Sequence, residues 1–186
     1  MASSFSPAEP STRERLVAAA TAEFRERGFD GTDSNKIARR AGFAPQTFYR
    51  WFKDKTEIFI AVYRAWEEEE RRFVGDLVRR QAGEAAVIEA AIQHHRDYLV
   101  FRRSLRRLSL EDPVVRAARA QSRLRQIERI RRGGEAGLSR DEVAVRLLQL
   151  ERLSDALAEG ELGDMGLDEA VARRRLVELL TELRSS

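Results

Sequence analysis

The 186-residue sequence has no cysteine, two histidines and four prolines. Without cysteine it forms no disulfide bonds or thiolate metal sites, and it suits a reducing compartment. No stretch reaches the roughly 18 consecutive apolar residues that a membrane-spanning helix needs. Residues 1–10 also lack the positive charge and apolar run that begin a secretion signal. We therefore expect a cytoplasmic protein with no membrane partner.

Charge is unevenly distributed, although its sum is small. All but three of the 34 basic residues are arginines, and the formal net charge is +3. Residues 61–140 carry 18 basic and 12 acidic residues, whereas residues 141–186 carry 6 and 11. This asymmetry suggests that the acidic end faces away from any polyanionic partner. Because arginine can also replace lysine in GC-rich genomes, composition alone does not establish nucleic-acid binding.

Helix-forming residues dominate the sequence, and no run of alternating apolar and polar residues predicts a β-strand. We therefore expect an all-α fold. Residues 1–10 are rich in serine and proline and are expected to form a disordered arm. The remaining length fits one small domain and one larger domain.

Capping residues, glycines and prolines indicate where the helices begin and end. The first helix is expected to begin at a Ser11 or Thr12 cap, with Glu14 closing a capping box, and to end before Gly28. Further helices are expected at 34–41, 45–51, 55–80, 84–108, 114–132, 140–159 and 167–184. The 84–108 helix has a candidate break near Arg103.

Two short predicted helices joined by a tight turn form the most informative pattern. In the second helix, Phe48 and Phe52 are four residues apart and are expected to face the core. Gln46, Tyr49 and Arg50 then lie on the opposite side. A helix with such a face fits the DNA major groove, where arginine pairs with guanine and glutamine with adenine. The candidate DNA contacts are Asn35, Lys36, Pro45, Gln46, Thr47, Tyr49, Arg50 and Lys55.

The residues around this second helix are expected to be either core residues or phosphate contacts. Phe43, Trp51 and Phe52 are expected to be core residues rather than DNA contacts. The hydroxyl of Thr47 suits a phosphate oxygen. Lys55, at the start of the next helix, is expected to direct its ammonium and free backbone N–H toward the same DNA strand.

In this region the sequence resembles the TetR family of one-component bacterial regulators. The family's N-terminal pattern is followed, in order and spacing, by the segments RLVAAATAEFRERGFDGT, IARRAG and TFYRWFKDK. The resemblance implies a helix-turn-helix DNA-binding domain, which we place at 11–53. It also implies a larger helical effector-binding and dimerisation domain, placed at 54–186, with a dimer formed by the last two long helices.

The resemblance also implies roles for single residues. Thr47, Tyr49 and Lys55 match the family's phosphate-contacting positions, and Gly42 matches its turn glycine. The sequence departs from the family where Ala44 replaces a common capping serine. A further departure is the glutamine that begins the expected base-reading face, where the family has a small residue. The operator sequence therefore cannot be inferred by analogy.

Aromatic and imidazole groups concentrate in the first half of the larger domain. Small-molecule pockets are mostly apolar with a few polar groups. The candidate effector-pocket residues, each of which could instead be plain core, are Tyr63, Trp66, His94, His95, Tyr98 and Phe101. Because the two histidines are adjacent, they point about 100° apart on a helix and do not form a metal-binding i, i+4 pair. We expect no metal site and no cofactor.

Two arginine-rich stretches, 102–107 and 116–125, leave two readings open. One is a solvated face. The other is a site for an acidic ligand such as a carboxylate or an acyl-coenzyme A.

The two predicted C-terminal helices carry apolar stripes and are expected to form a homodimer as a four-helix bundle with their two-fold mates. The residues assigned to the interface are Val143, Leu147, Leu150, Leu157, Val171, Val177, Leu180 and Leu183. Leu148 and Leu176 lie off these stripes. Each helix therefore has one side for its own domain and another for a second subunit.

No nucleophile with a base partner, glycine-rich phosphate loop or paired carboxylates stands out, so the sequence does not predict an enzyme. It predicts a sequence-specific transcriptional regulator that binds double-stranded DNA as a homodimer. Release from the operator by an unidentified small-molecule effector, and hence repression, is the expected output. Two alternatives remain open: an architectural DNA-binding protein without an effector, and a helical enzyme or scaffold that carries the same motif.

Overall fold

The computed structural model describes residues 9–133 and 137–184, which contain ten helices and no strand. The prediction of an all-α fold is confirmed. Most of the expected arm, residues 1–8, lies outside the described residues, and Glu9 and Pro10 are exposed. The helices are α1 (Thr12–Arg27), α2 (Ser34–Arg40), α3 (Pro45–Tyr49), α4 (Lys55–Arg79), α5 (Glu84–Asp97), α6 (Leu99–Glu111), α7 (Pro113–Gly133), α8 (Arg140–Glu159), α9 (Glu161–Asp164) and α10 (Ala170–Arg184).

The predicted start of α1 is confirmed by its cap. The Ser11 side chain accepts a hydrogen bond from the backbone N–H of Glu14, whose carboxylate bonds back to the Ser11 backbone. Gly28 ends the helix with a φ of 69°, a left-handed conformation that glycine adopts without strain. Asp33 caps α2 by accepting from the Lys36 N–H. The N-terminal helices therefore form where local hydrogen-bond chemistry favours them.

Two features of the later helices differ from the sequence-based expectation. The break in the 84–108 region lies at Tyr98, which has φ −114° and ψ 20°, and Arg103 lies inside α6. Neither glycine nor proline marks Tyr98, so local sequence rules did not locate the break. The short helix α9 was also not predicted; it follows Gly160, whose φ is 80°.

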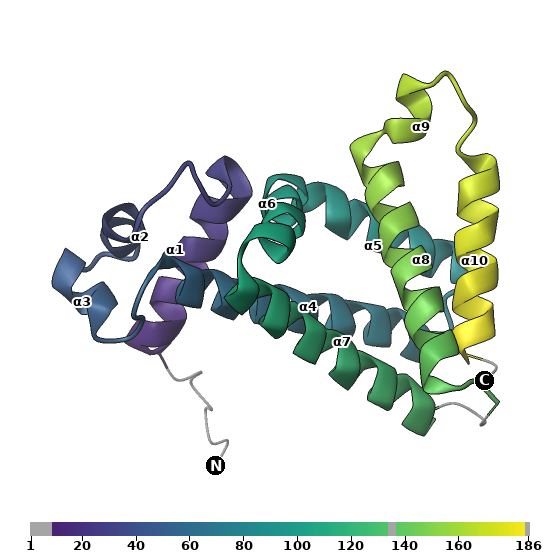
Figure 1. Cartoon of the computed structure of the whole chain (residues 1–186), viewed down its shortest axis with the longest axis horizontal. Helices are drawn as coiled ribbons and strands as arrows, with labels where there is room; N and C mark the ends of the chain where they lie inside the picture. Colours follow the sequence, from purple (N-terminus) through teal and green to yellow (C-terminus); the bar gives the residue numbers. More distant parts are fainter. Residues whose placement is uncertain (1–8, 134–136, 185–186) are drawn as a thin grey trace, which may run out of the picture.

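Figure 1 shows α1, α2 and α3 at one end of the molecule and α8 and α10 side by side at the other. Helix α4 extends from the first end toward the second, with α7 beside it. None of the helices in the described ranges combines the length and hydropathy needed to cross a bilayer.

One continuous core joins the small N-terminal unit to the rest of the chain. The Phe24 ring of α1 lies 5.1 Å from the Phe59 ring of α4, measured between centroids. Phe59 in turn lies 5.0 Å from Phe101 of α6. The first half of α4 therefore completes the core of the N-terminal helices while it also packs against the larger helical unit. Packed aromatic rings therefore connect α6 to the N-terminal helices.

Candidate DNA-binding face and effector pocket

Helices α2 and α3 are held together by a glycine turn and a small aromatic core. Gly42 has a φ of 79°, and the next N–H, that of Phe43, donates to the Ala38 carbonyl at 2.9 Å. Ile37 and Phe48 are fully buried, so each helix has a fixed inner face. The outer face of α3 is consequently a rigid surface.

The outer face of α3 carries the polar side chains that the sequence predicts there. Tyr49 is 59% exposed, and Gln46 and Arg50 are also exposed. Thr47 is half-buried, as is Pro45, the first residue of the helix. An amide, a phenol and a guanidinium therefore project from one short helix.

The first residues of α2 extend this face. The Tyr49 hydroxyl lies 2.8 Å from the Ser34 hydroxyl, which fixes the phenol relative to α2. Asn35 is exposed beside it, whereas Lys36 is half-buried and donates to the Gly31 carbonyl at 3.3 Å. The two helices thus present one continuous polar surface.

Lys55 makes contacts within the chain that the sequence did not predict. Its ammonium donates to the carbonyls of Phe29 and Thr32, at 2.8 and 3.0 Å, and lies 4.1 Å from the centroid of the Phe29 ring. Burial lowers the pKa of this lysine. The ammonium therefore fastens the loop between α1 and α2 to the start of α4 with two of its three N–H donors. Its third donor and the backbone N–H of Lys55 are the groups that a DNA contact would use.

Trp51 corrects a second expectation. It was predicted to be core, yet it is 46% exposed, while Phe52 is 2% exposed and Phe43 is half-buried. Phe48 and Phe52 already fill the inner positions after α3, which leaves the indole outside, next to Arg50. The spacing of the two phenylalanines was the available signal for this placement.

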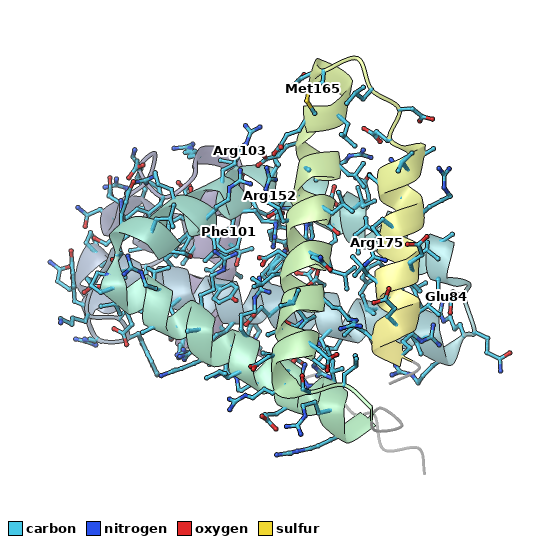
Figure 2. The ribbon with its side chains drawn as sticks, turned by 45° about the vertical axis from the view of Figure 1, so that its right-hand side comes forward. Glu84, Phe101, Arg103, Arg152, Met165 and Arg175 are labelled. Atoms are coloured by element: carbon cyan, nitrogen blue, oxygen red, sulfur yellow. The ribbon has the colours of Figure 1, made fainter. Side chains whose placement is uncertain are left out.

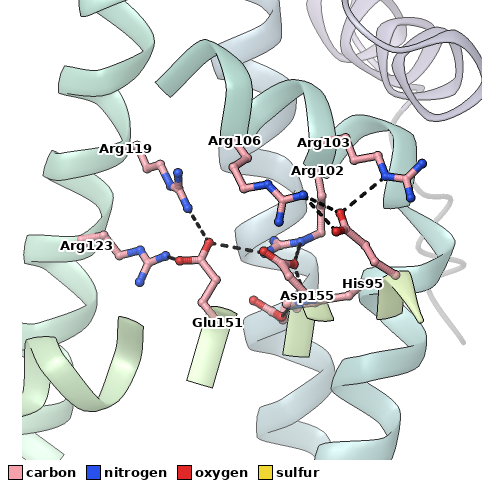
Figure 3. Close-up of polar contacts among 10 residues, drawn as sticks. His95, Arg102, Arg103, Arg106, Arg119, Arg123, Glu151 and Asp155 are labelled. Atoms are coloured by element: carbon pink, nitrogen blue, oxygen red, sulfur yellow. Dashed lines mark hydrogen bonds and ion pairs between the residues drawn. The ribbon is translucent and has the colours of Figure 1, made fainter. Parts of the chain in front are cut away.

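Inside the larger helical unit, arginines from α6 and α7 converge on acidic residues of α8 (Figure 3). Arg102 donates to Asp155 at 2.7 Å and to Glu151 at 3.3 Å. Arg119 donates to Glu151 at 2.8 Å, and Arg123 is paired with the same carboxylate. Much of the arginine-rich sequence therefore forms internal ion pairs rather than a solvated face.

His95 lies between two carboxylates in this network. Its Nδ1 is 3.1 Å from Asp155 and its Nε2 is 3.1 Å from Glu70. Burial disfavours a charged imidazole, but hydrogen bonds to Asp155 and Glu70 outweigh it and raise the pKa of His95. Burial likewise opposes the charge of Asp155, yet bonds from His95 and Arg102 hold the pKa of Asp155 far below its ordinary value. The imidazolium form suits this position because both ring nitrogens then donate.

The neighbouring His94 has the opposite electrostatics. It is buried against the rings of Trp66 and Tyr98, with centroids 5.4 and 5.0 Å away. Burial lowers the pKa of His94, and this effect exceeds the attraction of nearby carboxylates such as Glu70. The two adjacent histidines thus favour different protonation states.

This contrast predicts opposite pH dependences for two matched variants. Since the folded pKa of His95 is raised, its stabilisation is complete below about pH 6.5 and is lost as pH rises through the folded pKa. The loss of unfolding free energy in His95→Gln should therefore shrink as pH rises. For His94→Gln the pH dependence has the opposite sign. Because the pKa of His94 is lowered in the folded protein, protonation of the unfolded chain at acidic pH reduces the stability of the wild type, and the variant avoids this reduction. Urea unfolding between pH 5.5 and 8.5 measures both. Parallel pH profiles of the two variants would contradict this electrostatic assignment.

A pocket of about 800 Å³ lies among α4, α5, α7 and α8. Of the candidate effector-pocket residues, Tyr63, Trp66 and His95 line it. His94, Tyr98 and Phe101 do not: Phe101 is fully buried in the aromatic core, and Tyr98 lies under the Arg25 guanidinium of α1 at 4.4 Å. Sequence reasoning missed the contribution of α8 and α10, because their apolar residues were assigned to the dimer.

The apolar stripes assigned to the dimer mostly face the interior of one chain. Those fully packed inside are Val143, Leu147, Leu157 and Leu183. Those half-buried against the same cores are Leu150, Val177 and Leu180. Val171 alone among the assigned residues is mainly exposed, at 64%. The outward side of α8 instead carries Val145 and Leu148, which are 53% and 57% exposed.

Comparisons with known proteins agree with the helix-turn-helix geometry. Residues 16–62 match the family described as bacterial regulatory proteins, tetR family. The uncharacterized HTH-type transcriptional regulator YdgC of Bacillus subtilis (strain 168) is 33% identical over 67 residues, which cover 36% of this chain. The matched segment spans 34% of that relative, or about a third of its length.

Two solved structures share the fold over nearly the whole chain. A TetR-family transcriptional regulator from Rhodococcus sp. superposes with a TM-score of 0.68 at 18% identity, covering 94% of this chain and 98% of the other. One from Mesorhizobium loti MAFF303099 has a TM-score of 0.64 at 18% identity, covering 92% and 94%. At this level of identity the similarity concerns the fold.

Proposed function

We propose that the chain is a TetR-family regulator that acts as a homodimeric repressor and is released from its operator by a small-molecule effector. The match of its N-terminal helices to the family of bacterial regulatory proteins, tetR family, and the shared fold support this proposal. The outer face of α3 carries this proposal. Gln46 and Arg50 would read base edges, and Thr47 and Tyr49 would contact phosphates. Asn35 and the α2 start would add phosphate contacts.

The contact between α6 and the end of α1 supports release by an effector. The Phe29 N–H donates to the Ser104 hydroxyl of α6 at 3.0 Å. A Cβ at Gly28 would come within 2.9 Å of the same hydroxyl, so the two helices touch closely. Arg107 of α6 also pairs with Asp30 in the following loop. A shift of α6 would therefore move the DNA-binding helices.

The pocket supplies a place from which α6 can be shifted. Arg102 of α6 lines the pocket and lies two residues before Ser104. A ligand that prefers a different α6 position lowers operator affinity by its differential affinity for the two states. In a two-fold dimer, the recognition helices must lie about 34–36 Å apart, or a multiple, to enter successive major grooves. A small rotation at each α6 would spoil this spacing. The pocket thus favours an effector-controlled regulator over an architectural protein.

We place the dimer interface on the outward sides of α8 and α10. Figure 2 turns this end of the molecule forward, and Arg152 on α8 and Arg175 on α10 lie near the viewer. Val145 and Leu148 of α8 are 53% and 57% exposed, which is unusual for neighbouring apolar residues on a helix with a buried opposite side. On α10, Val171 is 64% exposed. A biological interface formed by these two helices would bury roughly 1,000 Å² or more.

The dimer is tested by replacing Val145 and Leu148 together with glutamate. The double variant should be a folded monomer, because four like charges would then face each other across the two-fold axis. Its affinity for DNA selected by the wild-type protein should fall by at least about a hundredfold, since one half-site contact is lost. Light scattering and fluorescence anisotropy measure these results. Leu110→Glu, at an exposed residue of α6, is the matched control and should remain dimeric. A double variant that stays dimeric would place the interface elsewhere.

A further inference from the structure

The pocket has one apolar wall and one cationic wall. The apolar wall is built by α5, α7, α8 and α10 and comprises Val87, Ile88, Ile130, Leu147, Leu150 and Leu180. The cationic wall includes Arg102 of α6 and Arg123 of α7. Trp66 of α4 also lines the pocket, and its ring lies against the Arg102 guanidinium. Such a division suits a molecule with a hydrocarbon body and a polar head.

The cationic wall has more donors than acceptors. Arg102, Arg119 and Arg123 all reach the single carboxylate of Glu151, and only Arg102 has a second carboxylate, that of Asp155 (Figure 3). Each guanidinium carries five N–H donors in a planar fork that matches a carboxylate. Burial lowers the pKa of Arg123, and the charge of Arg119 lowers it further. Among the described residues that line the pocket as a whole, six arginines face four glutamates, so positive charge is in excess.

Trp66 adds a second, independent observation. Its side chain is 5% exposed and lines the pocket, and among the described residues its indole Nε1 has no hydrogen-bond partner. The Arg102 guanidinium lies 4.5 Å from the centroid of the indole ring. A buried N–H donor without an acceptor is uncommon in folded proteins. Because the Nε1 atom itself is shielded from solvent, an oxygen of a bound ligand would become its acceptor when the side chains over the indole move apart.

The remaining charged residues of the pocket also carry more positive than negative charge. The other charged residues that line it from α4 and α7 are four arginines, Arg64, Arg71, Arg125 and Arg129, and three glutamates, Glu67, Glu68 and Glu70, the last of which pairs with His95. Clefts lined by an excess of one charge attract ligands of the opposite charge.

We propose that the effector is an amphipathic organic acid. Its carboxylate is held by Arg102, Arg123 and the Trp66 indole N–H, and its hydrocarbon body lies on the apolar wall. This inference rests on the proposed function, of which it names the ligand class. The ligand carboxylate competes with Glu151 for the arginines, which loosens the link between α8 and α6. Because Ser104 of α6 touches the end of α1, the same exchange lowers operator affinity.

The test measures ligand binding by isothermal titration calorimetry on the full chain without DNA. Octanoate, decanoate and dodecanoate are compared with decan-1-ol and decyltrimethylammonium, which share the tail but not the head. At least one acid should bind about tenfold or more tightly than either of the other heads. Absence of binding by all three acids, or a preference for the alcohol or the cation, would overturn the proposal.

Two variants locate the head group. Arg123→Gln should weaken binding of the preferred acid by about tenfold while leaving any decan-1-ol binding unchanged. Arg131→Gln, on the same helix but outside this pocket, should bind the acid like the wild type. Equal losses of acid and alcohol binding in Arg123→Gln would contradict the head-group assignment. Since the head-group comparison uses wild-type protein, the proposal stays falsifiable even if Arg123→Gln fails to fold.

A DNA-binding assay separates this inference from the proposed function. If the wild-type protein binds selected DNA but none of the acids, the proposal of a DNA-binding regulator stands and this ligand class is excluded. An acid that binds the pocket without changing DNA affinity would establish the ligand class and contradict effector release. Binding accompanied by at least about a tenfold loss of DNA affinity is the expected result.

Discussion

Replacing Arg50 by alanine should relax the base preference at one operator position by about 1–3 kcal/mol, up to about a hundredfold in affinity. Arg50 is exposed on α3 beside Gln46, and a guanidinium pairs with guanine through two hydrogen bonds. Gln46→Ala should have the same effect at a second position, where an adenine is expected. Fluorescence anisotropy on operators changed one base pair at a time measures both.

Tyr49→Phe is the matched control for this prediction. It removes a hydroxyl from the same helix, and a phosphate contact carries no sequence information. Its affinity should therefore fall alike for the operator and for random DNA. If Arg50→Ala and Gln46→Ala show that same uniform loss, the base-reading role of this face is wrong.

Replacing Asp155 by alanine should lower the free energy of unfolding by about 3–5 kcal/mol, a large part of the total for a protein of this size. Asp155 is 8% exposed and bonds to both Arg102 and His95. Without it, the buried Arg102 guanidinium keeps only Glu151 as a carboxylate partner, and the buried His95 ring keeps only Glu70. Urea unfolding at neutral pH measures the loss.

Two controls separate charge pairing from packing. Asp141→Ala, at an exposed residue of the same helix, should change the free energy of unfolding by less than about 1 kcal/mol. Arg102→Leu combined with Asp155→Leu should cost less than Asp155→Ala, because it removes the buried arginine together with the carboxylate that compensates it. A loss below about 1 kcal/mol for Asp155→Ala would show that the network contributes little to stability.

The sequence predicted helix boundaries best where a local signal determines them. The Ser11 capping box, the Asp33 cap and Gly28 depend on residues within one turn of each helix end. The break at Tyr98 has no such signal. Its ring lies against Arg25 of α1, so tertiary contacts favour the bend.

The residues of the candidate sites could likewise be predicted only where a local signal determines their placement. The face of α3 could be predicted because Phe48 fixes its inner side. The roles of Lys55 and Glu151 could not, because both depend on partners far away in the sequence, such as the Phe29 carbonyl. An apolar stripe likewise shows that a helix side is covered without showing by what. For α8, the side with Val143 packs on its own chain, whereas Leu148 remains exposed.

The most direct test of sequence-specific DNA binding is selection of bound duplexes from random DNA by the wild-type protein. We predict enrichment of an inverted repeat whose half-sites lie about 34–36 Å apart, centre to centre, or a multiple of that distance. The Gln46→Ala, Arg50→Ala double variant should enrich no such repeat. Failure of the wild-type protein to enrich any sequence, or enrichment of the same repeat by the double variant, would contradict recognition of DNA by α3.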